Sequence, residues 1–200
     1  MYHVLFNIKR KEHWQAVERM QEYAVEKRDQ LIHALVDGIA KAFADSQFLL
    51  NQSDFKPGAS FPDENESELR EAIAMTLENA AFFADLALHF PNTIAKLYKR
   101  AELKDLVDWA ITFSNSTGFY DTNSTRLMHL VGQELGLVKR DPTYINPYLF
   151  PSSSLSSAEM IDQVEKLRLL KIEKEKKAKK EAKRKKQRGP RLQGGSRTEL

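Results

Sequence analysis

Residues 80–88 have the sequence Ala-Ala-Phe-Phe-Ala-Asp-Leu-Ala-Leu, in which eight of the nine side chains are apolar. A helix made of this segment is apolar on nearly every side, and helices of that kind are buried rather than laid on a surface. Leu69, Ile73 and Leu77 continue the same helix upstream at spacings of four residues, and Pro91 is expected to end it. We therefore expect this helix to form the buried centre of an all-α protein.

The segment before this helix, residues 2–50, contains no proline and repeats apolar side chains at helical spacing. The repeating residues are Trp14, Val17, Met20, Ala24, Leu31, Leu35, Ile39 and Ala42. This pattern predicts one long helix, or two helices with a break near Gly38. Residues 51–62 are predicted to form a loop, and Asn65 followed by Glu68 is typical of the cap that opens a helix.

After the central helix, the pattern predicts three shorter amphipathic helices, at residues 93–100, 103–112 and 124–135. Gly136 is placed to end the last of them in the left-handed conformation that favours glycine. Several short amphipathic helices around one apolar helix predict a helical bundle. Residues 141–151 carry three prolines and three aromatic side chains, so we expect a non-helical strap that lies across the bundle.

Charge is distributed unevenly along the chain, although the net charge is only +3. Residues 1–165 hold 16 basic and 24 acidic side chains, whereas residues 166–200 hold 15 basic and 4 acidic ones. We therefore divide the chain into a bundle domain with its strap (1–151), a linker (152–157), a charged, partly disordered basic helix (158–188) and a flexible tail (189–200). Pairs four residues apart, such as Glu173 with Lys177, favour the helix without fixing it.

The basic run near the C-terminus is a candidate partner-binding segment. It comprises Lys176, Lys177, Lys179, Lys180, Lys183, Arg184, Lys185, Lys186, Arg188 and Arg191. Such a run is typical of a contact for an acidic partner, of a nuclear localisation signal or of an RNA-binding segment. No aromatic side chain interleaves it, which disfavours stacking on single-stranded nucleic acid. We therefore expect a protein partner rather than nucleic acid.

The sequence contains no recognisable catalytic or metal-binding motif. Cysteine is absent, which excludes disulfides, thiolate nucleophiles and cysteine metal sites. The five histidines lack metal-binding spacing, and neither a glycine-rich phosphate loop nor a nucleophile elbow occurs. We expect a non-enzymatic protein without cofactor or metal. We also expect no membrane span, and the first residues do not form an export signal.

Four Asn-x-Ser/Thr sequons, the acceptor motif of N-glycosylation, occur among the eight asparagines. They lie at Asn51, Asn65, Asn115 and Asn123. Asn115 is the best candidate acceptor because Thr117-Gly118 follows it beyond the end of a predicted helix. Chance and the capping of helices by asparagine are the alternative explanation for each sequon.

The last four residues, Arg197-Thr198-Glu199-Leu200, resemble the Lys-Asp-Glu-Leu signals that return proteins to the endoplasmic reticulum. They follow Gly194-Gly195-Ser196, which displays them on a flexible end. Together with the sequons, they indicate the lumen of the endoplasmic reticulum and predict a retrieval receptor as a partner. Because the chain lacks an export signal, we expect it to be a mature product or a fragment.

Several spaced motifs resemble the coiled-coil domain-containing protein 134 family. The first motif is Phe6 to Glu12, and the longest runs from Glu78 to Pro91. Within the longer one, a candidate contact or core block comprises Glu78, Asn79, Phe82, Phe83 and Asp85. Residues 109–113, the Asn115 sequon, residues 133–136, Asn146-Pro147 and the lysine-rich tail follow in the family's order.

The resemblance implies a luminal protein that is retrieved to the endoplasmic reticulum, with secretion as a second destination. Its most specific implication is an accessory role in the biogenesis of endoplasmin, the Hsp90 chaperone of that compartment. The role would be to limit endoplasmin's N-glycosylation near the translocon and the oligosaccharyltransferase. Two alternatives are a secreted helical regulator of mitogen-activated kinase signalling and a nuclear adaptor that uses the basic tail. Only Asn115 inherits the family's glycosylation assignment, and Ser114 stands where the resemblance predicts a cysteine.

Overall fold

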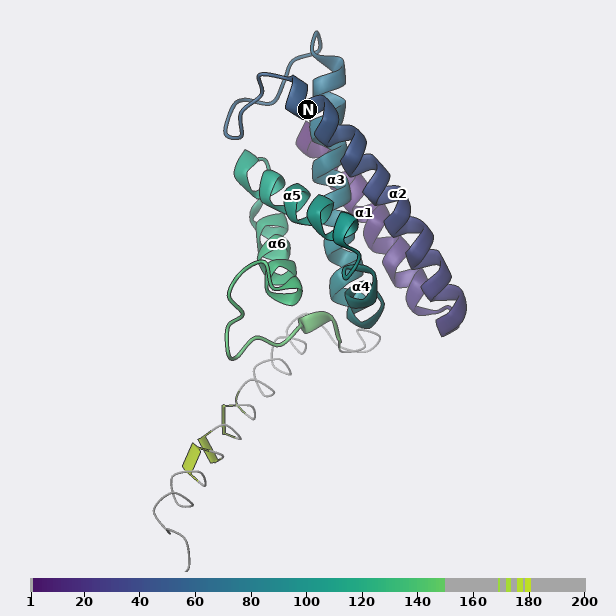
Figure 1. The fold of residues 1–200 in the computed structure, drawn as a ribbon, viewed down its shortest axis with the longest axis vertical. Coiled ribbons are helices and arrows are strands. Elements are labelled where there is room, and N and C mark those ends of the chain that lie inside the picture. Colours follow the sequence, from purple (N-terminus) through teal and green to yellow (C-terminus); the bar gives the residue numbers. More distant parts are fainter. Residues whose placement is uncertain (1, 150–168, 170–171, 174–175, 178, 181–200) are drawn as a thin grey trace, which may run out of the picture. The chain divides into compact units, whose positions relative to one another are not determined.

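The structure, a computed structural model, describes residues 2–149 together with residues 169, 172–173, 176–177 and 179–180 (Figure 1). The chain divides into two compact units, Met1–Asp141 and Pro142–Leu200. The first unit contains α1 (Tyr2–Gln21), α2 (Val25–Gln52), α3 (Ser67–His89), α4 (Pro91–Leu97), α5 (Ala101–Thr117) and α6 (Thr122–Leu135). The described residues form no strand, and the expectation of an all-α protein is confirmed.

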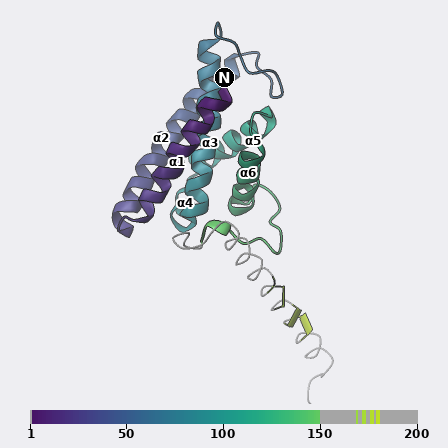
Figure 2. The ribbon, with the colours of Figure 1, turned by 180° about the vertical axis from the view of Figure 1, so that it is seen from behind.

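Helix α3 lies at the centre of the first unit and packs against each of the other five helices. Figures 1 and 2 show α1 and α2 along one side of it, and α5 and α6 on the other. All residues from Ala80 to Leu88 are buried, and Phe83 is 0% exposed. The segment that is apolar on nearly every side is therefore the core, as the sequence predicts.

The predicted break in the first helical region is in the wrong place. The structure separates α1 from α2 at residues 22–24, and the exposed Gly38 lies within α2. Residues 21–27 have no buried side chain, so packing does not hold a helix together there. Gly38, in contrast, is flanked by the buried Val36 and Ile39, whose packing outweighs the roughly 1 kcal/mol that a glycine costs inside a helix.

The face by which α2 packs is also displaced from the predicted one. The buried side chains are Ile32, Val36, Ile39, Phe43, Ser46 and Leu50. Leu31, which belongs to the predicted stripe, is 37% exposed, and Leu35 and Ala42 are only partly buried. Two neighbouring apolar stripes coexist on this helix, and periodicity alone does not decide between them.

The ends of the helices differ in part from the prediction. Asn65 does not cap α3, because the residue at the cap position is Glu66, whose side chain makes no capping hydrogen bond. Helix α6 begins earlier than predicted, where the Asp121 carboxylate accepts a hydrogen bond from the Ser124 N–H at 2.7 Å. Gly136 ends α6 with φ +78°, which confirms the predicted C-terminal glycine.

Three further helix boundaries differ from the predicted ones. Helix α3 ends at His89, and Pro91 opens the next helix instead of only closing the previous one. This is favourable because proline lacks the N–H that the first turn of a helix leaves unpaired. Helix α4 ends at Leu97 rather than at residue 100, and α5 extends to Thr117, which places Asn115 inside a helix and not beyond its end.

The second unit is described only in part. A 3₁₀ helix, η1, spans Pro147–Leu149, and the Tyr148 N–H donates to Asn146 Oδ1 at 3.0 Å just before it. The placement of this segment as a strap across the bundle stays a prediction. Residues 150–168, with the linker, and residues 181–200, with the retrieval-like end, lie outside the described residues.

Candidate functional site

The interface between α1 and α3 brings together two of the sequence motifs. Arg10, from the first motif, binds both carboxylate oxygens of Asp85, from the longest one. The distance from Nη2 to Oδ1 is 3.1 Å, and the Nη1 to Oδ2 contact completes a bidentate pair. The side chain of Asp85 is 1% exposed and that of Arg10 is 20% exposed. A charged pair therefore lies within an otherwise apolar helix contact.

Two histidines flank this ion pair. The His13 ring stacks on Phe82 with centroids 4.3 Å apart. His89 Nδ1 lies 2.8 Å from the backbone oxygen of Asp85, and Trp14 meets the His89 ring edge-on at 5.2 Å. Both rings are only partly exposed, so each histidine is held in an environment that disfavours its charged form.

Burial dominates the electrostatics of this cluster. It lowers the pKa of His13 to about 4, with the charges of Arg10 and Lys9 acting in the same direction. Burial also lowers the pKa of His89, against the opposing effect of the hydrogen bond between its ring and the Asp85 backbone carbonyl. The pKa of Asp85 is raised by burial, and the hydrogen bonds and charge of Arg10 oppose that rise. The cluster therefore joins α1 and α3 through side chains whose charged forms are disfavoured by burial.

The five residues of the candidate contact or core block differ in how far the structure buries them. Phe82, Phe83 and Asp85 are buried, so these three side chains belong to the core. Asn79 is half-buried and donates through Nδ2 to the Met75 carbonyl at 2.8 Å. Glu78 is half-buried, and burial raises its pKa. It lines a hollow beside α1, which makes it the member of the block best placed to meet a partner.

An aromatic cluster that the sequence analysis did not find joins three distant segments. Tyr2 stacks on Phe61 at 4.3 Å between ring centroids, and Phe61 meets Phe119 edge-on at 5.2 Å. The ring centroids of Phe6 and Tyr120 are 5.7 Å apart. The Tyr120 hydroxyl donates a hydrogen bond to the Leu77 carbonyl at 2.7 Å. These rings come from α1 and from two loops, so no periodic signal in the sequence links them.

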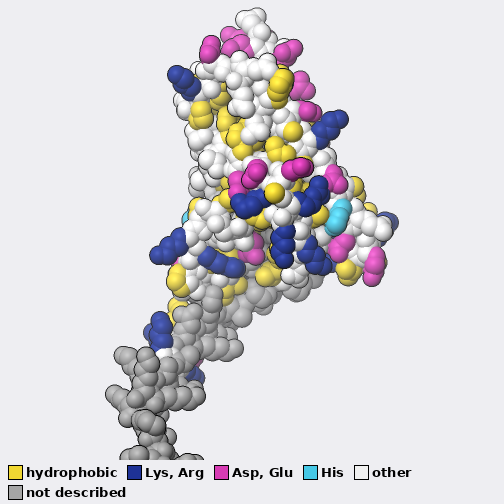
Figure 3. All heavy atoms as spheres, in the orientation of Figure 1, with side chains coloured by type: hydrophobic (Ala, Val, Ile, Leu, Met, Phe, Trp, Pro, Cys, Tyr) yellow, Lys and Arg dark blue, Asp and Glu magenta, His cyan; other side chains and the backbone are white. Residues whose placement is uncertain are grey.

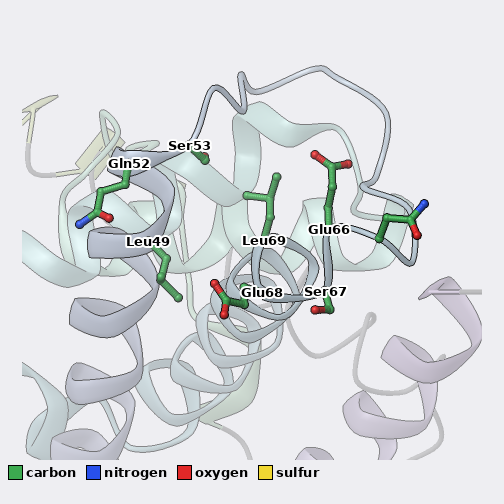
Figure 4. Close-up of a pocket in the computed structure, with 8 residues that line it drawn as sticks. Leu49, Gln52, Ser53, Glu66, Ser67, Glu68 and Leu69 are labelled. Carbon is green, nitrogen blue, oxygen red and sulfur yellow. The ribbon is translucent and has the colours of Figure 1, made fainter.

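The end of the unit where α2 meets α3 is hollowed (Figure 4). The hollow has a volume of about 520 Å³, and Figure 4 shows Glu68 between Leu49 of α2 and Ser67 at the start of α3. Ser53 and Asn65, which belong to two different sequons, also line it. Figure 3 shows acidic side chains gathered around this same end of the first unit.

The four sequons differ in how they present their third residue. All four asparagines are exposed. Asn65 lies in the loop before α3, and the hydroxyl-bearing Ser67 is exposed. Asn115 lies in the last turn of α5, and Thr117 is 3% exposed and donates to the Ser114 carbonyl at 2.8 Å. Asn65 is therefore the more accessible acceptor in the folded chain.

The two remaining sequons lie on helices. Asn51 is in the last turn of α2, and the Ser53 hydroxyl donates to the Leu50 carbonyl at 2.9 Å. Asn123 is in the first turn of α6, and Thr125 is exposed. Sequons are normally modified on extended surface segments, so each of these acceptors is less favourably displayed than Asn65.

The structure describes four lysines of the predicted basic run. Lys176, Lys177, Lys179 and Lys180 are exposed on helical backbone. Lys177 pairs with Glu173 at 2.7 Å, which confirms the predicted helical pair. Lys183, Arg184, Lys185, Lys186, Arg188 and Arg191, as well as Arg197, Thr198, Glu199 and Leu200, lie outside the described residues. In the described part of the chain, no group of three or more histidine, cysteine, aspartate or glutamate side chains is arranged to hold a metal, and none of the helices there has the length and apolar character of a membrane span.

These features define an all-helical protein whose central apolar helix is joined to its first helix by a buried ion pair. A family model described as "ERK and JNK pathways, inhibitor" matches residues 1–193. Coiled-coil domain-containing protein 134 of Xenopus tropicalis is 32% identical over 204 residues, which cover 100% of this chain and 86% of that protein. The Mus musculus protein of the same name is 28% identical over 151 residues, which cover 74% of this chain and 65% of that protein.

The chain therefore belongs to the coiled-coil domain-containing protein 134 family, and the resemblance seen in the sequence is confirmed. No solved structure matches it.

Proposed function

We propose that the chain is an accessory protein of the endoplasmic reticulum lumen that assists the biogenesis of endoplasmin through protein contacts. Its role is to limit the N-glycosylation of endoplasmin at the translocon and the oligosaccharyltransferase. The observation that carries this proposal is the similarity to coiled-coil domain-containing protein 134 along the whole chain. The retrieval-like Arg197-Thr198-Glu199-Leu200 end and the exposed sequon asparagines support the same compartment.

Physical features of the first unit support a contact role. Its exposed surface carries large apolar side chains, among them Leu5 and Phe48, which are 53% and 64% exposed. Glu66 and Glu68 line the hollow between α2 and α3. Apolar side chains beside one sign of charge are typical of a surface that binds an oppositely charged partner.

The compartment is tested by expressing the complete native reading frame in cells, with and without residues 197–200. The intact protein is expected to carry glycans sensitive to endoglycosidase H and to stay inside the cell, while the truncated protein escapes into the medium. An unglycosylated protein in the cytosol or nucleus would rule out the luminal role.

The endoplasmin role is tested by depleting the protein and counting the glycans on newly made endoplasmin by gel mobility. We expect additional glycans on endoplasmin and none on an unrelated luminal glycoprotein. Affinity purification of the intact protein should recover endoplasmin and components of the translocon. An unchanged glycan count after full depletion would refute this part of the proposal.

A second candidate function is restraint of mitogen-activated kinase signalling. The description of the matching family model, which names the ERK and JNK pathways, favours it. Purified protein added to cultured cells should then lower ERK and JNK phosphorylation after growth-factor stimulation. If only protein expressed inside the secretory pathway has this effect, a secreted regulator is excluded and the signalling effect follows from the luminal role.

A further inference from the structure

Two hollows on the first unit meet at Glu71, on the uncovered side of α3. One, of about 410 Å³, lies between α2 and α3 and is lined by Asp45, Leu49 and Met75. The other, of about 310 Å³, lies between α1 and α3 and is lined by Leu5 and Glu78. Glu71 lines both. The two hollows adjoin at Glu71, and the surface that they make up, called here the Glu71 groove, includes residues near the ends of α1, α2 and α3.

The floor of the Glu71 groove is apolar. Leu5 is 53% exposed, Leu49 is 39% exposed and Met75 is 38% exposed. They come from three different helices and line the two adjoining hollows. Exposed apolar side chains gathered in a concave surface are typical of a binding site for another protein. Methionine suits such a site because its flexible side chain adapts to the partner.

The rim of the groove is acidic. Asp45, Glu68, Glu71 and Glu78 line it, and Arg70 is the one basic side chain among the lining residues. Of the four carboxylates, Glu78 is half-buried and the other three are exposed. This excess of negative charge beside the apolar floor favours a partner with positive charge, and it opposes nucleic acid and anionic lipid.

The length of the groove along α3 suits a helix as its occupant. The α3 residues that line it run from Ser67 to Glu78, a length of roughly 17 Å at 1.5 Å per residue. That length matches about three turns of a second helix laid beside α3. An amphipathic helix presents an apolar stripe with long basic side chains on its flanks, which matches both the floor and the rim.

We propose that the Glu71 groove binds an amphipathic helix of a partner protein, with leucine-type side chains on its apolar face and lysine or arginine beside them. The inference deepens the proposed function and rests on it only in assigning protein contacts to the chain. Binding of such a helix in solution and association with endoplasmin in cells succeed or fail separately.

The test uses the full chain and a fluorescent synthetic peptide of about 18 residues, with leucines at helical spacing and lysines beside them. We expect fluorescence anisotropy to detect saturable binding that weakens as salt is raised. A peptide of the same pattern with glutamate in place of lysine should bind at least about tenfold more weakly. Equal binding of the two peptides would overturn the proposal.

Two variants locate the peptide. Glu71→Lys reverses the charge at the meeting point of the hollows and should weaken binding about tenfold. Glu102→Lys makes the same change at an exposed position of α5 outside the groove and should leave binding within about twofold. Circular dichroism melting confirms that both variants fold. If the two reversals weaken binding equally, general charge attraction explains the result and the groove is not the site.

Other occupants of the groove give distinct results. If the peptide binds much more tightly after Lys176, Lys177, Lys179 and Lys180 are changed to glutamine, the chain's own basic segment competes for the groove, and the proposal of a partner in trans is overturned. A dimer seen by sedimentation that Met75→Lys dissociates would assign the groove to a second copy. Vesicle binding that requires Met75 would assign it to lipid.

Discussion

Helices α1 and α2 both pack along α3, but they do so by different chemistry. Helix α2 buries five large or β-branched apolar side chains, Ile32, Val36, Ile39, Phe43 and Leu50. Helix α1 buries only Phe6, Val17 and Met20, and it places Arg10 and His13 in the same inward-facing row. The contact of α2 rests on apolar area, whereas that of α1 rests in part on one charged pair.

This difference separates strength from specificity. Apolar burial is favourable in many alignments of two helices, because it depends mainly on area. A buried carboxylate permits far fewer alignments of the two helices, because any alignment that leaves Asp85 without Arg10 costs several kcal/mol. We infer that α2 supplies most of the stabilising area, and that the ion pair sets the register of α1 against α3. The predictions below test this division.

Phe43→Ala on α2 should have the largest effect. Phe43 is 0% exposed, and truncating a buried phenylalanine removes both its transfer free energy and the packing around it. We expect the free energy of unfolding to fall by about 4 kcal/mol. Chemical denaturation of the full chain measures this loss. Phe48→Ala, on the same helix but 64% exposed, is the control and should change the free energy by less than about 1 kcal/mol.

Arg10→Met should be the next largest effect. It leaves the carboxyl of Asp85 buried without its partner, and we expect a loss of about 3 kcal/mol. The pKa of Asp85, already raised by burial, should rise further in this variant, so the loss should shrink at low pH. Lys9→Met breaks only the exposed pair with Glu12, 3.1 Å apart, and should cost less than about 0.5 kcal/mol.

The double variant Arg10→Met/Asp85→Leu distinguishes register from stability. It replaces both charges by apolar side chains, and we expect it to recover stability to within about 1 kcal/mol of the native chain. If the ion pair sets the register, this variant should show broadened or doubled NMR signals for α1 residues. Sharp, single signals at native positions would show that the apolar contacts fix the register unaided.

Acid should weaken the α1 contact more than the α2 contact. The pKa of His13 is lowered to about 4 and that of His89 is also lowered, so the unfolded chain binds protons more readily than the folded chain. The stability that the two neutral histidines contribute is therefore fully present above about pH 6.5, and it is lost as the pH falls toward about 4. The raised pKa of Asp85 acts in the opposite direction and offsets part of the loss.

We expect the melting temperature to fall by about 5 °C between about pH 7 and about pH 5. His13→Phe keeps a ring against Phe82 and removes the titrating nitrogen, so it should reduce this fall. A fall of the same size in the variant would show that His13 is not a source of the acid sensitivity.

The smallest effects concern the glycines. Gly38→Ala should stabilise the chain by about 1 kcal/mol, because Gly38 lies in the interior of α2 and an added Cβ meets nothing within 4 Å. Gly136→Ala should have the opposite sign, since Gly136 has φ +78°. Melting temperatures of the two variants check this. Destabilisation by Gly38→Ala would mean that the glycine serves a bend or a contact of α2.

The sequence predicts the core of this protein well because one segment decides it. Residues 80–88 are apolar on nearly every side, with Asp85 as the one polar side chain, so burial is the favourable state of the segment. The face of α2 was predicted less well, since Leu31 and Ile32 offer neighbouring stripes of similar hydrophobicity. The helices that α2 packs against, α3, α5 and α4, select between them. The cap at Asn65 failed for a related reason, because a local motif cannot report which turn the packed helix will begin on.

The candidate site was predictable only in its parts. The motifs that contain Arg10 and Asp85 are visible in the sequence, but their contact spans 75 residues and depends on how α1 returns to α3. The acidic rim has a weak signal, since Glu68, Glu71 and Glu78 recur at spacings of three and seven on one side of a helix. Tyr2, Phe61 and Phe119 meet through loops, for which no periodic pattern exists.

The hydroxyl of Thr117 is held inside the last turn of α5 by the Ser114 carbonyl. Modification of the Asn115 sequon would therefore report when α5 docks. In the proposed luminal location, an oligosaccharyltransferase would reach that hydroxyl only before α5 docks, whereas the Asn65 sequon keeps its exposed Ser67 afterwards. Chains are made at about 5–20 residues per second, and helices close far faster than that. If both sequons are used in the proposed compartment, the ratio of glycan at Asn115 to glycan at Asn65 would report how soon α5 docks relative to chain synthesis.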